Sequence, residues 1–403
     1  MTVIQRLQLA GSGMHLADQV ALVCVPLVAA LAFDASAQVI GILVACQSMA
    51  HLVGSLPFGL IVDRAEMRLV VVASILISLV GFLGTAASVW LGSVLGFGVW
   101  VTCAGFGIVL FVLAALSILP KAVETDALAQ ANARIEMPRA ISSFAVPLVI
   151  GIVISDATVG WVFVVATVGA VVALIFVLRL PSFEANGPAS EGVLRQVIQG
   201  GACVIKHDLL LAISLCSLFW NFAFSALLVA MVPLITDFHR IEPGAFGFAM
   251  SAFGLAAVAG SWTAARFANR IPPNLILLFG PGSSALAILA LFLMPSGGSA
   301  LFIYVIFFFL GFGPSMWLIV QNSVRQLVSP GHMLGRVNAV IQTAIYGVRP
   351  VGALLGGAFV EATSPKGGLI LIIGIYFLSF AAAAFSRLRA IRRYSDLKIA
   401  AMG

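Results

Sequence analysis

The feature of this sequence that most limits its fold is a succession of long apolar runs separated by short polar breaks. Each run has about 20 residues or more, which is enough for a helix to cross the hydrocarbon core of a bilayer. Only 9% of the 403 residues are charged and the mean hydropathy is +1.15. Such a chain cannot cover a water-soluble surface. The sequence therefore predicts an all-α protein that crosses a membrane many times.

The apolar runs form two sets of six. The first set is placed at 12–33, 37–62, 69–89, 91–119, 136–156 and 159–179, and the second at 209–236, 244–268, 274–295, 299–324, 336–360 and 367–387. We therefore expect 12 transmembrane helices in two six-helix bundles. The predicted domains are an N-terminal bundle at 1–180, a cytoplasmic linker at 181–208, a C-terminal bundle at 209–387 and a basic cytoplasmic tail at 388–403.

The two sets are related by a shift of 206 residues along the chain. Residue types agree at four pairs of positions with this spacing, each in a similar apolar or loop context. The pairs are Gly41 with Gly247, Gly54 with Gly260, Arg64 with Arg270, and Asn132 with Asn338. A parallel repeat of this kind is a known architecture of membrane transporters.

The distribution of Lys and Arg predicts the orientation in the membrane. Of the 21 basic residues, 18 fall on one side of the predicted spans. Arg240 and Lys366 fall on the other side, and Arg349 lies inside a span. Cytoplasmic loops collect basic residues, so we expect both termini and the linker in the cytoplasm of a plasma (inner) membrane protein. The net charge of +6 then reflects topology and does not indicate nucleic-acid binding.

A charged segment follows the second apolar run and, with two further stretches, carries a family resemblance. In the segment, Gly59, Asp63, Arg64 and Arg68 match a motif that reads roughly Gly-x-x-x-Asp-Arg-x-x-Arg-Arg, with one basic position unfilled. With the twelve spans and the parallel repeat, the chain resembles the major facilitator superfamily. The stretches 15–22 and 334–339 are similar to those of its enterobactin-exporter and macrolide-efflux branch. The resemblance implies a secondary transporter of a small molecule, working by alternating access.

One departure from the family bears on the coupling ion. Proton antiporters of the superfamily carry a Gly-rich pattern that ends Gly-Pro-x-x-Gly-Gly on the fifth span. Here the matching segment, 146–151, keeps only Pro147 and Gly151. The departure weakens the antiporter interpretation, although glycine can be replaced where helix backbones need not approach closely.

The motif also implies a gating role for its residues. Gly59 allows close packing of helices. Asp63 lies at the C-terminal end of its own helix, where an anion is disfavoured. The resemblance implies that the N-terminus of another helix, close to Arg336, lies near Asp63 and reverses that effect. In this interpretation Asp63 latches the two halves, with Arg64 and Arg68 setting topology and bridging. The alternative is an ordinary solvated charged turn.

Two protonatable side chains lie within the predicted spans. Asp18 is placed inside the first span, where an isolated carboxylate is costly unless it is neutral, paired or hydrated. His51 lies near the middle of the second span, with Gln47 one turn before it on the same face. A histidine changes charge near neutral pH, which suits proton coupling. The alternative for both residues is a structural hydrogen-bonding role.

A group of amides and aromatic residues lies on the spans 209–236 and 299–324. In the resembled fold these spans line the central cavity, and aromatic rings beside amides suit a large, partly apolar substrate. The alternative is hydrogen bonding between helices. The residues are Trp220, Asn221, Trp317, Gln321 and Asn322.

Arg349 is the most unusual charge in the sequence. It stands 13 residues after Arg336, which places it about 20 Å along a helix and close to the middle of the bilayer. A buried guanidinium stays charged and costs roughly 2.5–3.5 kcal/mol on insertion scales, so we expect an anionic or carbonyl partner. Arg349 is either an anchor for an acidic or phenolate group of the substrate, a switching partner for a carboxylate such as Asp18, or half of a fixed ion pair.

No motif for catalysis, nucleotide hydrolysis, metal or cofactor binding accompanies these residues, and the five cysteines form no disulfide framework. Three functions remain open. The chain is an exporter of a hydrophobic or amphipathic drug or siderophore driven by proton antiport, an importer that moves proton and solute together, or a non-transporting sensor or scaffold. The expected partners are a small-molecule substrate, protons and the lipid bilayer, with the chain as a monomer.

Overall fold

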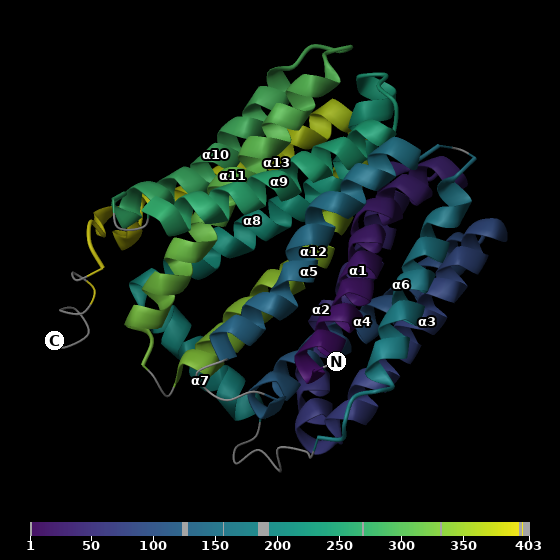
Figure 1. The fold of residues 1–403 in the computed structure, drawn as a ribbon. Helices are drawn as coiled ribbons and strands as arrows, with labels where there is room; N and C mark the ends of the chain where they lie inside the picture. Colours follow the sequence, from purple (N-terminus) through teal and green to yellow (C-terminus); the bar gives the residue numbers. More distant parts are fainter. Residues whose placement is uncertain are drawn as a thin grey trace. The chain divides into compact units, whose positions relative to one another are not determined.

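The computed structural model describes residues 2–122, 128–155, 157–183, 193–267, 270–330, 333–394 and 397. Throughout these ranges the secondary structure is helical, without a strand. The chain divides into two compact units, Met1–Ser190 and Glu191–Gly403 (Figure 1). The prediction of an all-α fold is confirmed.

The first unit contains six long helices. α1 begins after Thr2, whose hydroxyl accepts a hydrogen bond from the Gln5 N–H while the Gln5 side chain accepts one from the Thr2 N–H, and this reciprocal cap explains the early start. The helices are α1 (Val3–Phe33), α2 (Ala37–Arg64), α3 (Met67–Trp90), α4 (Val94–Ala122), α5 (Leu128–Val153) and α6 (Val162–Val177), which follows the 3-10 turn η2 (Val159–Trp161).

The second unit also contains six long helices, preceded by a shorter one. The short helix, α7 (Val193–Lys206), lies in the range predicted as a linker, to which the sequence analysis assigned no helix. The others are α8 (Asp208–Pro233) with a π-helical turn η3 (Leu234–Phe238), α9 (Gly244–Phe267), α10 (Pro273–Leu293), α11 (Ala300–Val328), α12 (Leu334–Ala362) and α13 (Pro365–Ala384), followed by the 3-10 turn η5 (Arg387–Ala390).

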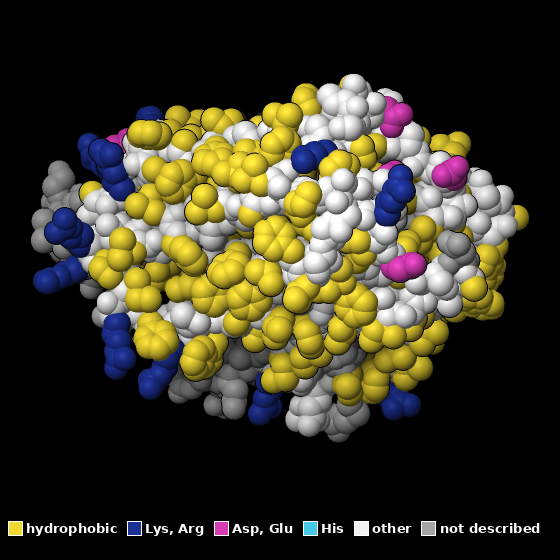
Figure 2. All heavy atoms as spheres, turned by 90° about the horizontal axis from the view of Figure 1, so that it is seen from above, with side chains coloured by type: hydrophobic (Ala, Val, Ile, Leu, Met, Phe, Trp, Pro, Cys, Tyr) yellow, Lys and Arg dark blue, Asp and Glu magenta, His cyan; other side chains and the backbone are white. Residues whose placement is uncertain are grey.

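Each predicted span corresponds to one of the long helices, with ends that differ by a few residues in most cases. Among the described residues, 11 helices are long and apolar enough to cross a membrane. α5 falls short of that length because its apolar part covers only Met137–Val153, and its polar N-terminal part was outside the predicted span. Figure 2 shows hydrophobic side chains over much of one face, as expected for a surface that meets lipid tails.

The helices of the two units pack in the same pairwise pattern. In the first unit α1 packs against α5 and α6, α3 against α4 and α6, and α2 against α4. In the second unit α8 packs against α12 and α13, α10 against α11 and α13, and α9 against α11. Each pair in the second list is the counterpart of one in the first. The structure therefore confirms the repeat that the sequence predicted.

The shift of 206 residues also relates individual contacts. A Cβ atom added to Gly105 on α4 would lie 2.9 Å from the Cβ of Ala50 on α2. A Cβ added to Gly311 on α11 would lie 3.2 Å from the Cβ of Ala256 on α9. Gly105 therefore allows α4 and α2 to approach closely, and Gly311 does the same for their counterparts α11 and α9. A second set of contacts obeys the same shift: Gly54 with Phe106, and Gly260 with Phe312.

Candidate functional site

The central polar contact of the second unit joins α8 to the middle of α12. Arg349 donates two hydrogen bonds to the side-chain oxygen of Asn221, from Nε at 2.9 Å and from Nη2 at 2.8 Å. The Asn221 amide nitrogen donates to the Ser217 carbonyl at 2.9 Å, which turns its oxygen toward Arg349. An amide oxygen is a neutral acceptor, so this contact orients the guanidinium and leaves its net charge unchanged.

The backbone and a neighbouring ring make further contacts around Arg349. Its guanidinium lies over the Tyr346 ring, 5.0 Å from the ring centre, which is a cation–π contact. The Ser225 hydroxyl donates to the Arg349 carbonyl at 2.7 Å. Pro350 has no N–H, so the helix loses one backbone hydrogen bond at this turn. The Asn221 amide oxygen is thus one partner of Arg349 in this unit.

A row of aromatic rings lies beside Asn221. The indole of Trp220 stacks on Phe224 with ring centres 5.0 Å apart, and Phe224 stacks on Phe253 of α9 at 5.2 Å. The Trp220 Nε1 donates to the Ser284 hydroxyl of α10 at 3.0 Å, and Tyr376 of α13 meets the indole edge-on. Trp220 and Asn221 are adjacent in the chain, so this row and the Arg349 contact share one turn of α8.

The predicted residues on α11 form a separate polar group. The Gln321 amide nitrogen donates to the Asn322 oxygen at 2.6 Å, and the same oxygen accepts from Arg325 at 2.7 Å. Trp317 packs against Gly280 of α10, one turn from Ser284. Three buried polar atoms on α11 have no hydrogen-bond partner among the described residues: Trp317 Nε1, Gln321 Oε1 and Arg325 Nε.

The candidate coupling residues of the first unit lie on α1 and α2. Asp18, Gln47 and His51 are all partly buried, and Gln47 and His51 are one turn apart as the sequence indicated. α4 packs against the same part of α2, where the Thr102 hydroxyl donates to the Cys46 carbonyl at 3.1 Å. Their proposed role in proton coupling stays a prediction.

The sequence analysis did not select His15, although the repeat points to it. His15 on α1 precedes Asn221 by 206 residues and is likewise buried. Arg139 on α5 acts electrostatically on the His15 imidazole, as Arg349 on α12 bonds to Asn221. In each unit, an arginine of the equivalent helix, α5 or α12, therefore acts on the buried side chain at this position. The repeat offset, applied to polar residues, was the signal that would have found it.

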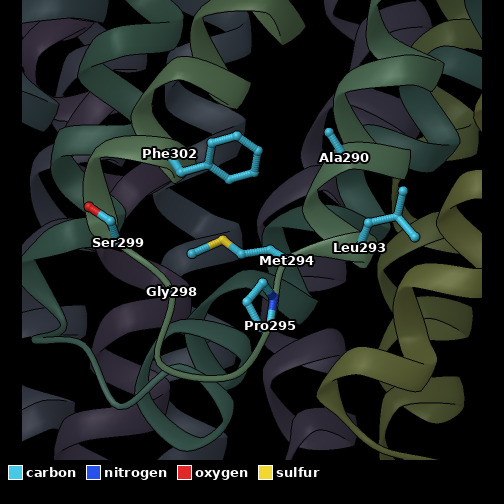
Figure 3. A pocket seen from close by; sticks show the side chains of 7 residues that line it. All are labelled: Ala290, Leu293, Met294, Pro295, Gly298, Ser299 and Phe302. Atoms are coloured by element: carbon cyan, nitrogen blue, oxygen red, sulfur yellow. The ribbon is translucent and has the colours of Figure 1, made fainter.

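An apolar hollow of about 480 Å³ lies at the turn between α10 and α11, away from these polar groups. Figure 3 shows the Met294 side chain between Phe302 and Pro295. Ser299 supplies the hydroxyl of a lining that is otherwise apolar. The hollow shares no residue with the Arg349 surroundings, and none of the residues that line it is charged.

The model of the Major Facilitator Superfamily matches residues 9–353, which is most of the chain. The chain belongs to the major facilitator superfamily. Members of this superfamily are transporters and not enzymes, so the expectation of a membrane transporter for small molecules is confirmed.

Curated relatives include proteins named "Enterobactin exporter EntS". The one from Escherichia coli O1:K1 / APEC is 27% identical over 350 residues, which are 84% of this chain and 82% of the relative. The one from Shigella boydii serotype 4 (strain Sb227) is 27% identical over 354 residues, covering 85% and 83%. The resemblance to the enterobactin-exporter branch is therefore present along most of the chain.

Solved structures of the superfamily share the fold at low sequence identity. The nucleoside transporter NupG superposes with a TM-score of 0.76 at 13% identity, covering 95% of this chain and 99% of that one. The D-xylose–proton symporter superposes with a TM-score of 0.75 at 13% identity, covering 98% and 99%. An inward-facing, occupied bacterial homolog of the human lysosomal transporter Spinster gives 0.74 at 16% identity, covering 98% and 97%.

The superfamily's charged motif lies at the end of α2. Gly59, Asp63 and Arg64 are helical, as expected at the C-terminal end of that span, and their side chains lie outside the described part of the structure. Asn269, the counterpart of Asp63 in the second half, lies outside the described residues.

Two further basic residues assigned to gating make contacts within their own units. Arg68 donates to the Leu178 carbonyl at the end of α6, at 2.8 Å, where a cation suits the negative end of the helix dipole. Arg336, at the start of α12, donates to the Gln199 side chain of α7. A role for either residue in bridging the two halves stays a prediction.

Proposed function

We propose that this superfamily member is a secondary exporter of a hydrophobic or amphipathic small molecule, driven by proton antiport. The substrate carries an acidic or phenolate group, as a siderophore or an acidic drug would. Transport proceeds by alternating access, with the bundles at 1–180 and 209–387 as its two halves. Both termini and the linker at 181–208 lie in the cytoplasm of the plasma membrane, and the chain works as a monomer.

The observation that carries the proposal is the arrangement around Arg349. The residue stands 15 positions after the start of α12 and 13 before its end, so its charge lies near mid-membrane. A mid-membrane charge is costly and marks a functional site by default. The Asn221 oxygen accepts two hydrogen bonds from the guanidinium and so fixes its direction. Such a group is suited to bind an anionic oxygen of a substrate.

The row of aromatic rings supports the proposal that the substrate is hydrophobic or amphipathic. Trp220 and Phe224 lie within one turn of Asn221 on α8, and Phe253 of α9 extends their stack. Rings beside a cation suit a planar, partly apolar molecule with an acidic group. On α11, Trp317, Gln321 and Asn322 supply further amide and indole groups. Among the described residues, Trp317 Nε1 and Gln321 Oε1 have no hydrogen-bond partner, so the first is able to donate to a ligand and the second to accept from one.

Direction and coupling rest on other grounds. The curated relatives that align with most of the chain are named exporters, which favours export. Asp18 and His51 are partly buried protonatable groups on membrane-spanning helices, which favours protons as the coupling ion. Asp63, with Gly59, Arg64, Arg68 and Arg336, is proposed to close the cytoplasmic side, as the family motif implies.

Two alternatives to a proton-driven exporter remain, and they differ in what crosses the membrane. A proton-coupled importer would move protons and solute in the same direction, and a non-transporting sensor or scaffold would move neither. Since the fold serves both exporters and importers, only a flux measurement separates them.

The test is uptake into everted membrane vesicles, with iron-free enterobactin as the first probe and a panel of acidic amphipathic drugs as the second. The proposal predicts accumulation that depends on the proton gradient and persists without ATP. Accumulation that survives collapse of the gradient, or that requires ATP, contradicts it. Asp63→Asn in correctly inserted protein should slow uptake, and an unchanged rate would refute the latch.

A further inference from the structure

The short helix α7 exposes an apolar stripe. Ile198 and Ile205 are 62% and 69% exposed, and Ala202 between them is also exposed. Positions separated by four and three residues fall on one side of a helix, so these three side chains form a continuous stripe. α7 is not one of the candidate membrane-spanning helices. Exposing such a stripe to water is unfavourable, so we expect an apolar neighbour to cover it.

The opposite side of α7 is fixed against α12. A Cβ atom added to Gly200 would lie 2.6 Å from the Arg336 carbonyl, so the two backbones are in close contact there. Val204 is buried in a cluster with Leu210 and with Val337 of α12. The Arg336 side chain donates to Gln199. Because this side is held, α7 cannot bury its stripe by rotating about its own axis.

Basic side chains stand beside the C-terminal end of α7. Lys206 ends the helix and is exposed. Two residues later, Asp208 forms an ion pair with Arg387 of η5, at 3.3 Å. Arg387, Arg389 and Arg392 are exposed on η5 and just after it. The stripe and a cluster of cations thus occupy the same end of the second unit.

We propose that α7 and η5 together form a binding surface for anionic phospholipids. Ile198, Ala202 and Ile205 enter the boundary between headgroups and acyl chains, while Lys206, Arg389 and Arg392 contact the phosphates. An amphipathic helix lies in the plane of the membrane in this manner, and clustered basic residues add attraction to a negatively charged leaflet. A second copy of the chain would offer the same cations and would repel them, so charge complementarity favours lipid over self-association.

The test uses a nitroxide label at position 205 in a variant whose five native cysteines are replaced, with Ile205→Cys as the attachment site. The full chain is reconstituted in phosphatidylcholine alone and in phosphatidylcholine mixed with phosphatidylglycerol. Collisions with oxygen report contact with lipid, and collisions with a water-soluble nickel chelate report contact with water. Leu286→Cys, on the exposed side of α10, supplies the lipid standard, and Ser296→Cys, in the turn after α10, supplies the water standard.

The label at 205 should match the Leu286 standard in oxygen access, and it should move deeper when phosphatidylglycerol is present. Arg389→Gln with Arg392→Gln should remove that lipid dependence and leave transport of the probe substrate unchanged. A label that matches the Ser296 standard in both lipid mixtures overturns the proposal. So does a label shielded from both reagents, which would show a protein partner. Equal depth in the two mixtures overturns the preference for anionic lipid.

Discussion

The Asn221 side-chain oxygen accepts two hydrogen bonds from the Arg349 guanidinium, at 2.9 and 2.8 Å. A carboxylate in the place of Asn221 would make the same two contacts and would also cancel the charge. The chain instead has an amide, held in orientation by the Ser217 carbonyl. Replacing this amide by a carboxylate provides a direct test between two roles considered for Arg349, the fixed ion pair and the substrate anchor.

Asn221→Asp should reduce transport although it strengthens the contact with Arg349. The new carboxylate would compete with an acidic group of the substrate for the same guanidinium. We expect at least about a tenfold fall in transport, corresponding to about 1.4 kcal/mol, with normal insertion and unchanged or higher thermal stability. The measurement is initial uptake at matched protein levels. If Asn221→Asp transports as well as the wild type, Arg349 is a structural residue.

Arg349→Ala should insert and fold but transport poorly. The substitution removes a charge that is costly at mid-membrane, so insertion should not suffer. Arg349→Lys keeps the charge and loses the planar fork that binds two acceptors, and it should rescue transport only partly. Uptake and membrane abundance are measured together for the three proteins. Full activity of the Ala variant would exclude Arg349 as a substrate anchor or a coupling partner.

The sequence predicted the helices well because each apolar run is long and each break is polar. It missed α7 because the apolar residues of this helix are separated by polar ones and form no long apolar run. The sequence singled out Arg349 because a charged side chain at mid-membrane has a high free-energy cost. That Asn221 is a partner of Arg349 depends on how α8 packs on α12. Linear spacing carries no information on that packing. His15 was missed because the offset of 206 residues was applied to glycines and loop residues and not to the polar residues of the spans.

Gly311→Ala should destabilise the second unit. The added methyl group would meet the Phe253 carbonyl at 2.5 Å, so α9 and α11 would have to move apart. Overpacking of this kind costs about 1–3 kcal/mol. The measurement is thermal unfolding in detergent, monitored by the native tryptophans. Gly374→Ala is the matched control, because a Cβ atom there meets no other atom within 4 Å, and it should leave the melting temperature unchanged or slightly raised.

His239 should make stability depend on pH. It is buried just beyond η3, and burial, together with the nearby Lys366 charge, lowers the pKa of its imidazole, while the Pro295 backbone opposes the shift only weakly. A lowered pKa means that the folded state prefers the neutral ring. The stabilising contribution is therefore complete above the ordinary pKa of about 6.5 and is lost as the pH falls below it, with a slope of at most about 1.4 kcal/mol per pH unit.

The prediction is tested by thermal unfolding between about pH 7.5 and 5. His239→Gln should flatten the loss of stability on acidification relative to the wild type, since the glutamine does not titrate. Lys366→Gln should flatten it less, because burial is the larger cause. An identical pH profile for His239→Gln and wild type would show that another group controls the acid sensitivity.

The most direct test of the central claim is the direction of proton movement during transport. Purified protein is reconstituted into vesicles that contain a pH-sensitive dye, with an acidic interior and iron-free enterobactin or an acidic amphipathic drug added outside. Proton antiport predicts that the interior becomes more alkaline only when the substrate is present, and that Arg349→Ala abolishes the signal. Acidification of the interior with substrate uptake would indicate an importer, and no substrate-dependent proton movement for any probe that binds would contradict the account.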